Sequence, residues 1–214
     1  MKKIFLLLLC GAMFTAAGCL DKKEAPVEVP QIDVAPTLEP YTVADGVFDV
    51  DAVRSNITIK GQHFDLPVKL SSLGSEWEYR LYSRSEYGLK NGSGLATLYF
   101  NGVEMCTASL ENCYKGAEKE SVVYSISIKN SDSDIYGIVP LISTVSDVEK
   151  LLGKPDDEQT MEIPFMHSYT YGVLSGTDDK GVVRGHSVTV DFDQNGVVDF
   201  VSVTYSDMSG TEQK

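Results

Sequence analysis

Positive charge is scarce in this chain of 214 residues. It carries 18 lysine and arginine residues against 31 aspartate and glutamate residues, so the formal net charge is −13. No cluster of basic residues interrupts this acidic background. A surface of this charge repels phosphate backbones at long range, which excludes nucleic acid as a partner. The simplest role of the acidic residues is to keep the protein soluble.

Histidine is scarcer still, and the motifs of common catalytic sites are missing. None of the three histidines, His63, His167 and His186, belongs to a His-Glu-x-x-His motif or lies near a Gly-x-Ser-x-Gly nucleophile turn. There is no glycine-rich phosphate loop. Paired carboxylates such as Asp178 and Asp179 lie in turn-like contexts, where solvated charge is the usual explanation. The sequence therefore predicts a protein that is not an enzyme and that carries no cofactor.

A membrane-spanning run is also missing, since a transmembrane helix needs about 20 apolar residues. The N-terminal apolar run is shorter. It begins at Ile4, directly after Lys2 and Lys3, and ends in small residues before Cys19. A charged start, a short apolar stretch and a small-residue end are typical of a signal peptide. We predict that residues 1–18 are such a peptide.

The residues around the cleavage point, Ala16-Ala17-Gly18-Cys19, resemble the lipobox of bacterial lipoproteins. The resemblance implies that Cys19 becomes the first residue and carries lipid, including fatty-acyl chains such as palmitate. Cys10 fits less well, because the preceding Leu9 is larger than cleavage tolerates. The alternative is ordinary secretion with an unmodified Cys19. Lipidation predicts an anchor in the cell membrane or outer membrane, with the body in the periplasm or extracellular space.

A stretch rich in proline and acidic residues follows, over residues 19–47. It contains Pro26, Pro30, Pro36 and Pro40 and almost no aromatic side chain. Such a composition favours an extended tether of up to roughly 60 Å. We expect the hydrophobic core to begin only at about Phe48.

Residues 48–134 are predicted to form a β-rich N-terminal subdomain. Its clearest signal is Asn101-Gly102, because Asn-Gly suits the positive φ angles of a two-residue hairpin turn. That turn pairs Phe100 with Val103 and Leu98 with Met105, which places all four side chains on one face.

Residues 135–207 are predicted to form a second subdomain, in which a helix precedes antiparallel strands. Ser146 and Glu149 are predicted to form a capping box, and Gly153 is predicted to end the helix. A second two-residue turn at Asn195-Gly196 is predicted to pair Val190 with Val201 and Val188 with Val203. A three-residue turn would instead pair Thr189 with Val201, which does not keep the apolar side chains on one face. Residues 208–214 are predicted to be a disordered tail.

The segments Val148–Pro155 and Asp191–Gly196 carry a family resemblance. They look like the repeat of the small outer-membrane assembly lipoproteins of the SmpA, OmlA or BamE type, and of the β-lactamase-inhibitor-like fold. The resemblance covers residues 137–205 and implies an α+β fold, a short helix packed on small antiparallel sheets. The predicted subdomains 48–134 and 135–207 are then candidates for related β-rich units, although the N-terminal one has only Lys69–Gly74 in place of the helix.

The same resemblance implies a role in the cell envelope. It favours a protein-interaction or assembly module that binds a protein partner. A binding or inhibitory module for an exported enzyme is the first alternative, and an enzyme acting on envelope polymers is the less favoured one. Trp77, Tyr79, Tyr169 and Tyr171 are the candidate interaction residues, because Tyr and Trp are frequent interface anchors. The alternative is a place in the core, since an aromatic side chain on a two-sided strand can serve either role.

Cys106 and Cys113 are separated by six residues and would leave the reducing cytosol together. They form either a disulfide or two buried free thiols. A calcium loop is the remaining candidate, since Asp191, Asp193 and Asp199 fall at ligand positions of that pattern. Ser202 stands where the pattern requires a bidentate glutamate. The sequence therefore predicts a plain hairpin and no metal site.

Overall fold

The computed structural model describes residues 47–82, 92–162, 165–179 and 181–206. The signal peptide, Cys19, nearly all of the tether and the C-terminal tail predicted above lie outside these residues. Within the described ranges, no helix combines the length and the apolar character that crossing a membrane requires.

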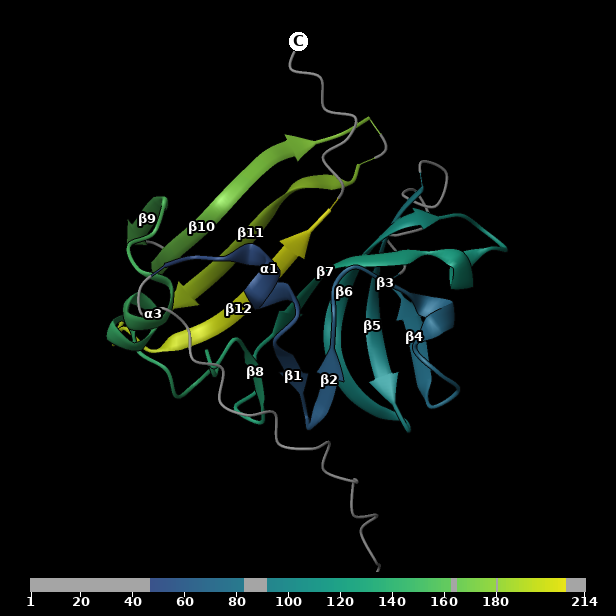
Figure 1. Ribbon diagram of the computed structural model, residues 1–214, viewed down its shortest axis with the longest axis horizontal. Coiled ribbons are helices and arrows are strands. Elements are labelled where there is room, and N and C mark those ends of the chain that lie inside the picture. The colour runs from purple at the N-terminus through teal and green to yellow at the C-terminus, as the bar shows by residue number, and fades with distance from the viewer. Residues whose placement is uncertain (1–46, 83–91, 163–164, 180, 207–214) are drawn as a thin grey trace, which may run out of the picture. The chain divides into compact units, whose positions relative to one another are not determined.

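Most of the described chain belongs to one antiparallel sheet of nine strands, the large sheet (Figure 1). Its main path has the order β4-β5-β6-β7-β12-β11-β10-β9, and β3 pairs with β7 beside this path. The strands are β3 (Val68–Lys69), β4 (Trp77–Leu81), β5 (Gly92–Phe100), β6 (Val103–Cys113), β7 (Val122–Ile128), β9 (Asp157–Glu162), β10 (Phe165–Thr177), β11 (Val183–Phe192) and β12 (Val198–Tyr205).

This architecture shows that the predicted α+β fold class is wrong. The protein is mostly β, and its helical segments are short: α1 (Val50–Arg54), α3 (Val145–Leu152) and the 3-10 turns η1 (Leu70–Ser72) and η2 (Glu118–Glu120). The two predicted subdomains do not form separate small sheets either. Each supplies a meander of four strands, and β7 pairs with β12 to join the meanders edge to edge. All described residues belong to one compact unit.

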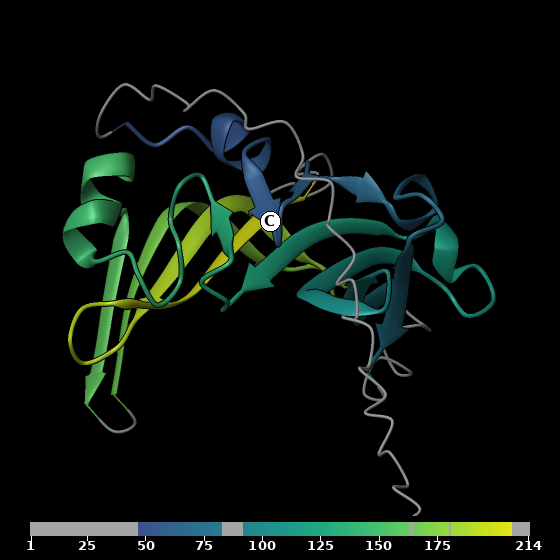
Figure 2. The same cartoon turned by 90° about the horizontal axis from the view of Figure 1, so that it is seen from below.

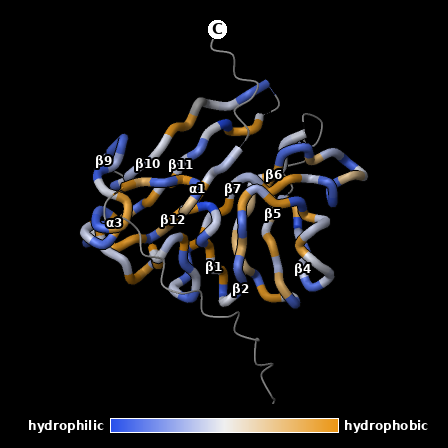
Figure 3. Tube along the Cα trace, viewed as in Figure 1, coloured by the Kyte–Doolittle hydropathy of each residue, from blue (hydrophilic) through white to orange (hydrophobic). Residues whose placement is uncertain are grey.

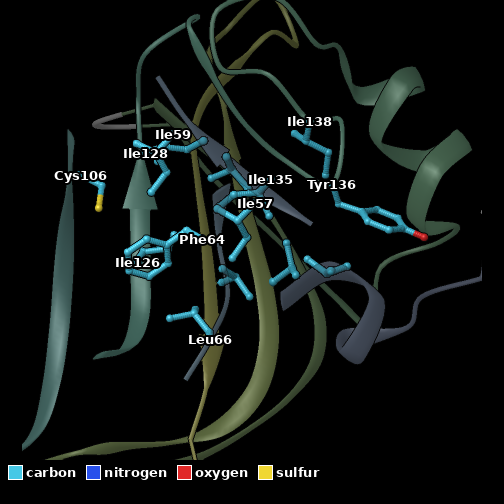
Figure 4. Close-up of a cluster of buried hydrophobic side chains, with 14 of the residues drawn as sticks. Ile57, Ile59, Phe64, Leu66, Cys106, Ile126, Ile128, Ile135, Tyr136 and Ile138 are labelled. Atoms are coloured by element: carbon cyan, nitrogen blue, oxygen red, sulfur yellow. The ribbon is translucent and has the colours of Figure 1, made fainter. Parts of the chain in front are cut away.

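A second, smaller layer lies on one face of the large sheet, together with α1 and α3 (Figure 2). It is a three-stranded sheet of β1 (Ile57–Ile59), β2 (Gln62–Phe64) and β8 (Ser133–Ile135). Because β8 pairs with β1, the predicted boundary at residue 134 runs through a shared sheet. The buried side chains of both layers form one core, which includes Ile57, Ile59, Phe64, Leu66, Ile126, Ile128, Ile135 and Ile138 (Figure 4).

The Asn101-Gly102 hairpin forms as predicted at its turn and differs one step further away. Both turn residues have positive φ, 49° and 77°, and Phe100 pairs with Val103. Leu98, however, pairs with Cys106, because a β-bulge shifts the register between Leu98 and Tyr99. An extra residue in one strand increases its local twist, so the bulge contributes to the curvature of the sheet.

The second hairpin has the predicted strand register but a different turn. Val190 pairs with Val201, and Val188 pairs with Val203, as expected. The turn itself has three residues, since the Asp193 N–H donates to the Val197 carbonyl. A bulge between Asp191 and Phe192 then restores the two-residue register. The predicted turn type was therefore wrong, although the predicted pairing away from the turn is confirmed.

Helix α3 begins two residues earlier than predicted and ends where predicted. Thr144 is the N-cap, and its side chain and that of Asp147 form the capping box in place of Ser146 and Glu149. Hydrogen bonds from the Thr144 backbone and hydroxyl lower the pKa of Asp147. The stop at Gly153 is confirmed, because this residue has a φ of 80°. The helix buries Val148 and Leu152 against the large sheet.

Candidate binding face

The large sheet has two faces of different chemistry. Successive side chains of a strand point to opposite faces, and hydrophobic and hydrophilic residues alternate along the strands (Figure 3). On β7, Ile126 and Ile128 point into the core, so Ser125 and Ser127 point to the opposite side. We call this opposite side the open face. Among the described elements, α1, α3 and the small sheet all lie on the other side (Figure 2).

Hydroxyl side chains form a continuous row across the open face. The strand register connects them one by one, from β5 through β6, β7, β12 and β11 to β10: Thr97, Thr107, Ser127, Ser202, Thr189 and Thr170. The row is flanked by Arg80 on β4 and Asp157 on β9, which are the neighbours of Thr97 and Thr170. Every strand of the main path therefore contributes one residue, and the charges lie only at the two ends.

A second row runs parallel to the first, two residues further along each strand. It contains Leu95, Ser109, Ser125, Thr204 and Ser187. The hydroxyls hydrogen-bond across strands, since Thr204 Oγ1 donates to Ser125 Oγ at 2.9 Å. At the β4 end, Thr97 Oγ1 donates to the Tyr82 hydroxyl at 3.2 Å. Tyr82 is 44% exposed and Leu95 40% exposed, so apolar area borders the hydroxyl rows at this end.

An ion-paired cluster joins distant strands at one end of the open face. Its cation is Arg184 on β11, whose Nη1 lies 2.6 Å from Glu111 Oε2 on β6. Nη2 of the same guanidinium lies 2.8 Å from Asp178 Oδ2. We call these three residues the clamp. Glu111 follows the core residue Leu110, so it points to the open face.

The clamp shows that β6 and β11 come close together at this end of the sheet. Strands β6 and β11 are separated by β7 and β12, which in a flat sheet would place them about 14 Å apart. Tyr124 adds a second link, because its hydroxyl accepts a hydrogen bond from Val183 N at 3.3 Å. Burial disfavours the charged form of Arg184, but its hydrogen bonds to Asp178 and Glu111 outweigh this and raise its pKa. The clamp thus fixes the curvature at this end.

The four predicted interaction aromatics lie on the covered side of the sheet instead. Tyr169 and Tyr171 are 5% and 0% exposed, so the prediction that they are exposed anchors is wrong. Their hydroxyls hold α3, donating to Glu149 Oε1 and to the Gly153 carbonyl. Burial raises the pKa of Tyr169 to about 12.

Trp77 and Tyr79 are half-buried at the edge of the same covered side. The Trp77 ring lies 5.7 Å from the Phe64 ring and 5.3 Å from the Phe100 ring, both in edge-to-face geometry.

Sequence reasoning missed the hydroxyl residues of the open face. Their signal is the alternation of Ser or Thr with apolar residues in Val201–Tyr205.

The possible disulfide between Cys106 and Cys113 is absent, and the alternative of two buried free thiols is what the structure contains. Both residues belong to β6. Seven steps along one strand separate them by roughly 23 Å, whereas a disulfide needs Cα atoms within about 7 Å. Burial raises the pKa of Cys106 to about 12, so this thiol is unreactive as well as unpaired with Cys113.

The aspartates of the calcium pattern have structural roles or remain apart. Asp193 Oδ1 accepts hydrogen bonds from the N–H groups of Asn195 and Val197, which stabilise the turn. These bonds hold the pKa of Asp193 below its usual range. In the ranges that the structure describes, no group of three His, Cys, Asp or Glu residues is placed to bind a metal ion.

We therefore expect the melting temperature to be the same in millimolar calcium and in a chelator. Asp193 is already engaged by backbone donors, and Asp191 and Asp199 flank a bulge on different strands. Differential scanning fluorimetry checks this, with magnesium as the control for charge screening. A rise of several degrees with calcium alone, lost in Asp193→Ala, would contradict the assignment of this segment as a plain hairpin.

The histidines do not come together either. His63, His167 and His186 lie on β2, β10 and β11. His167 Nε2 lies 2.9 Å from Glu158, and His186 stacks on the Tyr205 ring at 4.1 Å.

Comparisons of the chain with protein-family models, with curated proteins and with solved structures found no match.

Proposed function

We propose that this protein is a lipid-anchored module of the cell envelope that binds another protein through the open face of its large sheet. The observation that carries the proposal is the hydroxyl row from Thr97 to Thr170, in which Thr97 is buried and the other five side chains are partly exposed. The lipobox-like residues before Cys19 and the resemblance to envelope assembly lipoproteins support the location. The proposed activity is binding and not catalysis.

The chemistry of the rows suits recognition better than simple solubility. A solvent face usually carries long charged side chains, which lose much conformational entropy when a partner covers them. Serine and threonine side chains lose little conformational entropy when a partner covers them. Each hydroxyl both donates and accepts hydrogen bonds. Tyr82 adds amphipathic contact area at the rim. The same pairing of tyrosine with small hydroxyl residues is used by antibody binding sites.

The position of the charges narrows the kind of partner. The chain carries a net charge of −13, yet the hydroxyl rows between Arg80 and Asp157 are uncharged. A partner surface that is neutral and polar therefore matches the centre of the face without leaving a buried charge unpaired. Contact with nucleic acid stays excluded by the overall charge.

Site-specific photo-cross-linking in cells tests the proposal. A cross-linking amino acid is placed at Ser127 or Thr189, in the middle of the open face, and at Lys150 on α3 as the control on the other side. We expect one protein to be captured from Ser127 and Thr189 and not from Lys150. Capture from Lys150 alone would contradict the assignment of the binding face.

A disrupting variant tests the same contact without a cross-linker. Ser127→Arg with Thr189→Arg introduces two long cations into the uncharged rows, so the captured protein should no longer copurify with the full chain from membranes. Lys150→Glu changes the charge on α3 by the same magnitude with the opposite sign and should keep the partner. Copurification that survives the double substitution, in a variant with an unchanged circular dichroism spectrum, would refute the proposal.

A further inference from the structure

Among the residues that the structure describes, the large sheet ends in β4 and β9, and these two edges differ in the charges that could prevent another strand from pairing with them. Edge strands expose unpaired backbone groups, and charged side chains commonly block pairing with another chain. Strand β9 carries Asp157, Glu158 and Glu162 and has no basic residue. Strand β4 carries Glu78 and Arg80, one of each sign, within the five-residue segment Trp77–Leu81. The β4 edge is therefore not protected by charge of one sign.

The backbone of β4 has hydrogen-bonding groups directed outward. Tyr82 N donates to the Leu95 carbonyl, and Asn101 N donates to the Glu76 carbonyl. In an antiparallel pair every second residue bonds to the neighbouring strand, so the even-numbered residues of β4 bond to β5. The odd-numbered residues, Trp77, Tyr79 and Leu81, then direct their backbone groups to the outer edge. Trp77 N also makes a long contact of 3.4 Å with the Gly74 carbonyl.

We propose that the outer edge of β4 pairs with β4 of a second copy of this chain, antiparallel and centred on Tyr79. This register is self-complementary: it places Glu78 opposite Arg80 of the second copy, and by symmetry Arg80 opposite Glu78. Both side chains are exposed on the open side of the strand. The pairing is isologous, as in most two-fold symmetric dimers.

The neighbouring registers of the β4–β4 pair place like charges opposite each other. Only registers that pair odd-numbered residues with one another use the outward hydrogen-bonding groups. Moving the centre to Glu78 places this glutamate opposite its own copy, and moving it to Arg80 places the two arginines opposite each other. Like charges directly opposite destabilise a strand pair, and the register centred on Tyr79 avoids them while it pairs Glu78 with Arg80 twice.

The geometry of the pair strengthens the charge contact. Glu78 and Arg80 occupy non-hydrogen-bonded positions of the new edge, where opposite side chains approach most closely. On the other side of the strand, the half-buried Tyr79 meets its own copy, and Trp77 meets Leu81. Five-residue strands bury less area than a permanent dimer needs, so the association is weak and reversible.

Charge reversal tests the register. Sedimentation velocity of the full-length chain in a neutral detergent should show a monomer–dimer equilibrium that depends on protein concentration. Arg80→Glu and Glu78→Arg each place like charges at both symmetric contacts, and each should weaken dimerisation by roughly tenfold or more. The double variant Glu78→Arg with Arg80→Glu exchanges the two charges and should restore the dimer.

A matched change at the other edge provides the control. Glu162→Lys alters the charge of β9 by the same amount as Glu78→Arg alters that of β4, and it should leave the dimerisation constant unchanged. The proposal is overturned if the wild-type chain is monomeric at all concentrations, if the double variant fails to restore the dimer, or if Glu162→Lys weakens it equally.

Discussion

Replacement of Arg184 by methionine is expected to lower the free energy of unfolding by roughly 3 kcal/mol. The Glu111, Asp178 and Arg184 side chains of the clamp are only 14%, 17% and 16% exposed. Removing the cation therefore leaves two carboxylates close together and largely shielded from water. A shielded charge that has lost its partner costs far more than the pair contributed, which explains the size of the expected effect.

Urea denaturation of the wild-type and variant chains, monitored by Trp77 fluorescence, measures this difference. Lys69→Met is the matched control, because Lys69 lies 3.9 Å from Glu120 in a pair whose side chains are 60% and 66% exposed. An exposed pair of this kind contributes about 0 to 1 kcal/mol. Equal losses in the two variants would show that the clamp is no stronger than a surface ion pair.

The clamp bears on the proposed binding face as well as on stability. Because Arg184 connects β11 to β6 across two intervening strands, its loss should relax the curvature that arranges the hydroxyl rows. Capture of the partner from Ser127 should then fall with the stability change, whereas Lys69→Met should leave it unchanged.

The sequence predicted correctly those turns and helix ends whose backbone conformation is determined by a few neighbouring residues. Asn101-Gly102 adopts the positive φ angles that its sequence favours, and Gly153 ends α3 as expected. The helix start was misplaced because two candidate capping boxes overlap. Ser146 fits the sequence pattern equally well, but Thr144 is the residue whose backbone forms the antiparallel bridge to Val197 that brings the chain to the helix.

The fold class could not be obtained in the same way, because it depends on contacts between distant parts of the chain. Nothing near Ser127 in sequence indicates that it pairs with Ser202 and thereby joins the two meanders. The bulges beside Tyr99 and Phe192 are likewise set by how the sheet must curve. The predicted pairing of Val201 and Val203 implied that both valines lie on one face of their strand, but not that the hydroxyl residues of the other face would align with those of five other strands.

Glycine at position 172 is expected to be indispensable: Gly172→Ala should lower the free energy of unfolding by roughly 3 kcal/mol. Gly172 has a φ of +82°, a conformation that a Cβ atom disfavours. An added Cβ would also overlap the carbonyl oxygen of His186 on the neighbouring strand and would lie 2.9 Å from the Phe48 ring. Because the first obstacle is backbone, it cannot move without breaking the pairing of β10 with β11.

Gly176→Ala separates the two causes, since Gly176 lies on the same strand with a φ of +96°, and no atom of the described residues would lie within 4 Å of its added Cβ. It carries the conformational cost alone, about 1 kcal/mol. The difference between the two variants, measured from urea midpoints at equal slope, then isolates the overlap with His186. Should Gly172→Ala prove no more harmful than Gly176→Ala, β10 and β11 would have to be further apart at this point than the register of Gly172 with Ser187 allows.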